Sequence, residues 1–98
     1  MDEFDFAVPP FKAADALAGL KRSLRELGLA EREGRFERRG VAIAKAAVDG
    51  AAIAAAVVKK PSRSSPEWQA KTLTSAAQVR DFVAHVKQQL AAWSDRDD

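Results

Sequence analysis

Two apolar arms of eight residues each, on either side of Asp49-Gly50, make up residues 41–58. Asp-Gly between apolar arms is the strongest short-range signal for a β-hairpin, because glycine adopts a positive φ without steric cost and aspartate tolerates one. We therefore expect two antiparallel strands joined by a two-residue loop. Paired strands at this point would place the whole chain among the α+β proteins.

The composition of the same segment leaves an alternative open. Nine of its eighteen residues are alanine, the best helix former, whereas six are valine or isoleucine, which favour strands. Each arm is also shorter than most independent helices. The segment therefore favours strands, and two short helices broken at Gly50, as part of an all-α bundle, are the alternative.

A two-residue loop at 49–50 also predicts which residues pair. It places Val48 opposite Ala51 and Ile43 opposite Ala56. Because side chains alternate along a strand, the hairpin then has two faces. One face contains Val48, Ile53 and Val57, and the other contains Val41, Ile43, Lys45 and Val58.

Helical periodicity appears on both sides of the hairpin. Leucines at 17, 20, 24 and 27 predict a helix over residues 11–27, with Gly28 as its C-terminal cap and Leu29 packing back on Leu24. Ser75 and Gln78 have the spacing of a capping box, which predicts the start of a second helix. Its apolar stripe consists of Val79, Phe82, Val83, Val86, Leu90 and Trp93.

Further strands are predicted at 35–39 and 68–74, separated from the hairpin by Gly40 and by the loop 59–66. The predicted fold is a single α+β domain over residues 11–94, in which two helices pack on an antiparallel sheet. The element order is α-β-β-β-α, with a fourth short strand left open. Residues 1–10 are predicted to be a flexible acidic arm, and residues 95–98 a frayed acidic tail.

Several classes of site are disfavoured by composition. The chain has no cysteine and a single histidine, His85, so no usual zinc site is expected. The five glycines stand singly, which does not fit a phosphate-binding loop. We therefore expect no metal, no cofactor and no enzymatic activity. The acidic start of the chain and the lack of a long apolar run predict a cytoplasmic protein without membrane contact.

Positive charge is concentrated in the body of the chain. The formal net charge is only +2, but residues 11–94 contain fifteen Lys and Arg against eight Asp and Glu. The predicted register places Arg39 beside Lys60, so the open end of the hairpin would gather basic residues from two segments. The predicted binding residues are Arg35, Arg38, Arg39, Lys59, Lys60 and Arg63. Such a cluster favours an anionic partner.

The function expected from these patterns is that of a small non-enzymatic binding protein that acts through protein–protein contacts. RNA or another polyanion is the alternative partner, because phosphate contacts need little beyond Lys and Arg. Tyrosine is absent and Trp68 is the one aromatic residue near the cluster, which disfavours base stacking. The small side chains of the hairpin also leave a homo-oligomer open.

Overall fold

Two helices and five strands follow one another in the computed structural model, which describes residues 11–62 and 64–96. The fold class is α+β, as the hairpin interpretation predicts, and the all-α alternative is wrong because both arms of 41–58 are strands. The elements are α1 (Ala13–Glu26), β1 (Ala30–Arg32), β2 (Arg35–Arg38), β3 (Val41–Asp49), β4 (Ala52–Val58), β5 (Trp68–Leu73) and α2 (Ala76–Arg96).

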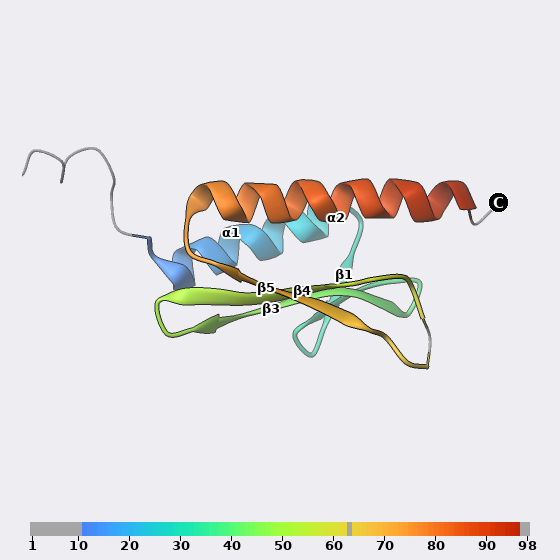
Figure 1. The fold of residues 1–98 in the computed structure, drawn as a ribbon, viewed down its shortest axis with the longest axis horizontal. Coiled ribbons are helices and arrows are strands. Elements are labelled where there is room, and N and C mark those ends of the chain that lie inside the picture. Colours follow the sequence, from blue (N-terminus) through green and yellow to red (C-terminus); the bar gives the residue numbers. More distant parts are fainter. Residues whose placement is uncertain (1–10, 63, 97–98) are drawn as a thin grey trace, which may run out of the picture.

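The five strands form one antiparallel sheet in which each strand pairs with the next along the chain, in the order β1-β2-β3-β4-β5. Both helices lie on the same side of this sheet (Figure 1). One face is therefore covered by helices, and the other carries no helix of residues 11–62 and 64–96. We call them the helix-covered face and the helix-free face.

The sheet has more strands than the sequence predicts, because two tight turns lie within the charged segment 30–40. Glu33 and Gly34 both have positive φ, at 53° and 82°, and so do Arg39 and Gly40, at 56° and 80°. Two consecutive positive φ values are the pattern of a type I′ turn, whose twist matches that of a hairpin. The first turn creates β1, which the sequence analysis missed, and the second joins β2 to β3.

The central hairpin forms, but its register differs from the predicted one by two residues. Asp49 pairs with Ala52 and Val48 with Ile53, so the loop consists of Gly50 and Ala51. Gly50 alone adopts a positive φ in this loop, at 62°. This pattern is typical of a type II′ turn, which needs glycine at its first central position and spares Asp49 a left-handed conformation. A shift of two residues leaves every side chain on its predicted face.

Burial shows which face the helices cover. Phe36 pairs with Ala44 and Ala44 with Val57, and all three are fully buried. The intervening residues Lys45 and Ala54 point to the opposite face and are exposed. Most of the core therefore lies between the helix-covered face and the apolar stripes of the helices, which contribute Leu20, Leu24, Phe82, Val86, Leu90 and Trp93. Val58, which alternates with Val57 and so points to the other face, is fully buried as well.

The end of α1 and the start of α2 form as the sequence predicts, with one difference, whereas α1 begins at Ala13 instead of residue 11. After α1, the Leu29 amide donates to the Leu24 carbonyl and the Gly28 amide to the Arg25 carbonyl, which is a Schellman motif. Before α2, the Ser75 hydroxyl accepts from the Gln78 amide at 3.2 Å. The Gln78 side-chain oxygen, however, accepts from the amide and hydroxyl of Thr74, one residue before the predicted partner.

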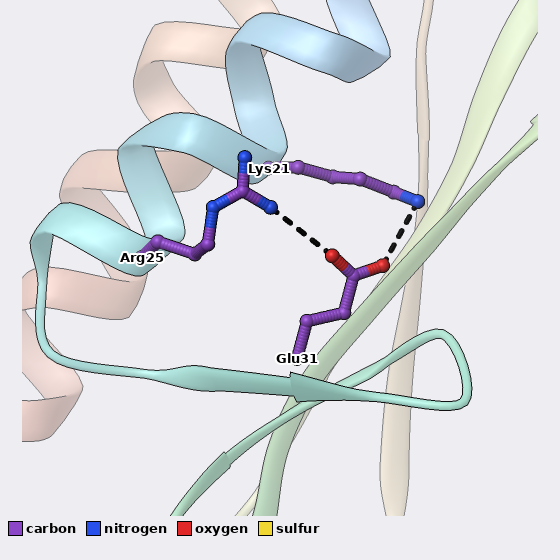
Figure 2. Close-up of polar contacts among 3 residues, drawn as sticks. All are labelled: Lys21, Arg25 and Glu31. Atoms are coloured by element: carbon purple, nitrogen blue, oxygen red, sulfur yellow. Dashed lines mark hydrogen bonds and ion pairs between the residues drawn. The ribbon is translucent and has the colours of Figure 1, made fainter.

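An ion-pair cluster joins α1 to the first edge strand. The Glu31 carboxylate lies between Lys21 Nζ, at 3.0 Å, and Arg25 Nη1, at 3.1 Å (Figure 2). These side chains are partly exposed, so each pair contributes at most about 1 kcal/mol. Glu31 pairs with Phe36 in the sheet, and so it lies on the helix-covered face.

The predicted acidic arm, residues 1–10, lies outside the described residues, as do residues 97–98 of the predicted tail. The backbone of α2 continues to Arg96. Neither helix in the described part of the chain has the length and apolar character needed to cross a membrane.

Candidate binding surfaces

Three cations lie side by side on the helix-free face, and we call them the basic row. Arg32 of β1 pairs with Arg35 of β2, and Arg35 pairs with Lys45 of β3. Because neighbouring strands are about 4.8 Å apart, the row is about 10 Å long. None of the three cations forms an ion pair with a described carboxylate. Directly opposed like charges destabilise a sheet, so the row favours an anionic partner.

Lys45 is held in place by an aromatic ring. Its Nζ lies 4.4 Å from the ring centroid of Trp68, the first residue of β5. A cation over an indole face is stabilised by about 0.5–1 kcal/mol at an exposed site. Lys45 therefore has a preferred position at one end of the basic row, and one face of the Trp68 ring is occupied.

A hollow of about 460 Å³ lies next to the basic row. Arg35 and Lys45 line it, together with Glu33 and Gly34 of the β1–β2 turn. Its floor is formed by alanines of three strands: Ala47 of β3, Ala54 and Ala56 of β4, and Ala70 of β5. Because alanine has only a methyl group, a partner on this floor would approach the sheet backbone closely.

The predicted binding residues occupy two places instead of one. The β2–β3 turn and the β4–β5 loop lie at the same end of the sheet, because β2, β3, β4 and β5 are consecutive antiparallel neighbours. Arg38 and Arg39 are at the first of these connections, and Lys59 and Lys60 are at the second. We call these four residues the basic end.

The shifted register changes which of these residues are neighbours. If the pairing of Ala44 with Val57 is continued, Lys60 is level with Val41 instead of Arg39. Val41 pairs with Arg38, so Arg38 and Lys60 are separated by two strand spacings, about 10 Å. The topology thus gathers the two segments, whereas the predicted pairing of Arg39 with Lys60 is wrong.

The remaining two predicted residues do not belong to the basic end as described. Arg35 is at the opposite end of β2, beside the β1–β2 turn, and takes part in the basic row. Arg63 lies outside the described residues.

A second cavity, of about 280 Å³, lies between β5 and the N-terminal half of α2. Asp81 and His85, one helical turn apart, line it together with Lys71 of β5. His85 Nε2 is buried and has no hydrogen-bond partner among the described residues. This arrangement can accept a small polar molecule. In the described ranges, no three His, Cys, Asp or Glu side chains are grouped so as to hold a metal ion.

Sequence reasoning missed Arg32 and Lys45 as members of a binding surface. The signal that could have identified Arg32 is Glu33-Gly34, because a two-residue turn there places Arg32 opposite Arg35. Lys45 stands out as the one charged residue within the first apolar arm, on the face that the helices leave open.

Comparison with known proteins adds no relative: no family model, no curated protein and no solved structure matches this chain.

Proposed function

We propose that this chain is a non-enzymatic binding protein that contacts a partner protein through the helix-free face of its sheet. One observation carries the proposal: the basic row and the alanine-floored hollow adjoin each other on a face that no helix covers. The hollow can exclude water from apolar groups of a partner, and the cations can meet its carboxylates. Such a combination of an apolar centre and a polar rim is typical of protein interfaces.

The experiment is affinity capture with the full chain as bait, after nuclease treatment of the lysate. Ala54→Arg places a long charged side chain on the floor of the hollow, and Ala18→Arg makes the same change on the exposed surface of α1. Proteins that bind the helix-free face should be retained by the parent and Ala18→Arg and lost with Ala54→Arg. A captured set that Ala54→Arg leaves unchanged would rule out this face. Thermal unfolding of both variants checks that they fold.

A second candidate is polyanion binding, RNA included, at the basic end. It is favoured by the topology, which brings Arg38 and Arg39 to the same end of the sheet as Lys59 and Lys60. Phosphate contacts require little beyond such a group of cations, and their strength falls steeply with salt.

This candidate is tested by titrating duplex RNA, single-stranded RNA and duplex DNA at low and moderate salt. Arg39→Glu/Lys60→Glu should abolish binding if the basic end makes the contact. Arg22→Glu/Lys87→Glu changes the net charge equally at exposed positions of the two helices and is the matched control. Equal loss in both double variants would mean that only net charge matters, and no binding at low salt would exclude the candidate.

A further inference from the structure

We propose that the partner segment seated on the helix-free face is an acidic amphipathic α-helix of another protein. It would place its apolar side in the alanine-floored hollow and its carboxylates against the basic row. This inference rests on the proposed function and adds the chemistry of the partner.

The charges indicate an acidic partner. Arg32, Arg35 and Lys45 are opposed in register without a described carboxylate between them. Glu33, at the rim of the hollow, offsets only one of the three charges. Acidic residues placed four apart on a helix have Cβ atoms about 5–6 Å from each other, close to the strand spacing of about 4.8 Å that separates the residues of the basic row. Successive acidic residues of one helix side can therefore reach successive members of the basic row.

The hollow has dimensions that suit a helix. The residues of the basic row are paired across neighbouring strands. The same line of paired residues continues from Lys45 to Ala56 of β4 and then to Ala70 of β5. A helix that follows the basic row runs across the strands, and the floor from β3 to β5 measures two strand spacings, about 10 Å, which about two helical turns span. The alanines exposed on this floor are Ala47, Ala54 and Ala70. Over their methyl groups the helix can pack close to the sheet, and its leucine-sized side chains can fill a volume of about 460 Å³.

The position of the hollow argues against strand addition, the other common way of binding a peptide. Strand addition uses the free backbone groups of a sheet edge. The edges of this sheet are β1 and β5, whereas the residues that line the hollow lie mainly on β3 and β4. A partner that covers the face is therefore held by side chains, as in helix-in-groove recognition.

Two other occupants fit less well. Single-stranded nucleic acid binds sheet faces by stacking bases on exposed aromatic rings, but Lys45 already covers one face of the Trp68 ring. A second copy of this chain would bring another set of the same three cations to the interface, and like charges brought together across an interface are unfavourable.

The test is selection from a displayed peptide library with the full chain as bait. Enriched sequences should carry acidic residues three or four positions apart beside an apolar stripe. One enriched peptide is then synthesised with a fluorophore, and its affinity is measured by anisotropy. Arg35→Glu and Ala54→Arg should each weaken binding by about tenfold or more, whereas Ala18→Arg should not. Circular dichroism should show that the peptide becomes helical on binding.

Charge exchange makes the test specific. A peptide whose acidic residues are replaced by lysine should bind Arg35→Glu better than it binds the parent. If the library yields no enriched peptide, or yields peptides without acidic residues, the inference is overturned while the proposed function is still judged by affinity capture. It is also overturned if the face variants abolish self-association in sedimentation, or if a labelled oligothymidine competes with the peptide for the face.

Discussion

The two faces of the sheet are built from the same kind of residue and use it differently. On the helix-covered face, Ala44 is fully buried, with Phe36 and Val57 as its cross-strand neighbours. On the helix-free face, Ala54 is exposed and forms part of the floor of a hollow. The small side chain of Ala44 lets α1 pack closely against the sheet. The small side chain of Ala54 leaves room for a molecule outside the chain.

The charges show the same contrast. Glu31, on the helix-covered face, is shared by Lys21 and Arg25 of α1. Arg32, the next residue, points to the other face and is opposed by Arg35. Glu31 therefore has its charge balanced within the chain, whereas the basic row presents like charges to solvent. This difference is the electrostatic basis of the binding role that we propose for the helix-free face.

The helix-covered side should be the most sensitive to truncation. Phe82 of α2 is 2% exposed and belongs to the core. Phe82→Ala should lower the free energy of unfolding by roughly 3–5 kcal/mol, because it removes buried surface and leaves a cavity. Urea denaturation measures the change. An almost unchanged midpoint would mean that the apolar stripe of α2 does not supply the core.

Replacing one alanine of each face by leucine compares directly how tightly the two faces are packed. Ala44→Leu adds volume where no space is left and should destabilise the domain by about 1–3 kcal/mol. Ala54→Leu adds the same atoms on the open floor and should change stability by at most about 0.5 kcal/mol. Similar losses in urea denaturation for both variants would contradict the assignment of the two faces.

A substitution in the turn of the central hairpin should cost less stability than the truncation of Phe82. Gly50 has a φ of 62°, and a β-branched residue at this angle is strained. Gly50→Val should therefore destabilise the domain by about 1–2 kcal/mol. Ala51→Val, at the second loop position, is the control and should cost less, since Ala51 does not have a positive φ. Equal costs would contradict a positive φ at Gly50 that Ala51 does not share.

Much of the fold could be predicted because its signals are local. The leucine stripe of α1, the cap at Gly28, the start of α2 at Ser75 and the hairpin at Asp49-Gly50 each depend on residues a few positions apart. The register could not be predicted as safely, because Gly50 takes a positive φ in either loop and the sequence does not say whether Asp49 does as well.

The candidate surface was harder to predict than the fold, since it depends on that register. Arg35 was identified as a binding residue, but its neighbours in the structure are Arg32 and Lys45 and not the basic end. The grouping requires three strands to be aligned at once, and an error at one turn moves a residue to another neighbourhood. The opposite face also had to be known as covered before this one could be recognised as open.

The smallest expected changes in the free energy of unfolding come from single charges, and they have opposite signs on the two faces. Arg35→Thr removes the middle charge of the basic row and should raise stability by about 0.2–1 kcal/mol at low salt, because directly opposed like charges are relieved. Glu31→Gln removes the acceptor shared by Lys21 and Arg25 and should lower stability by a similar amount, about 0.2–1 kcal/mol. Both changes should shrink as salt screens the charges. Both changes are measured by urea denaturation at low and at high salt, because urea is uncharged and does not itself screen the charges. A loss of stability in Arg35→Thr at low salt would mean that a carboxylate of the chain already neutralises the row, and the case for an external acidic partner would then lose its electrostatic basis.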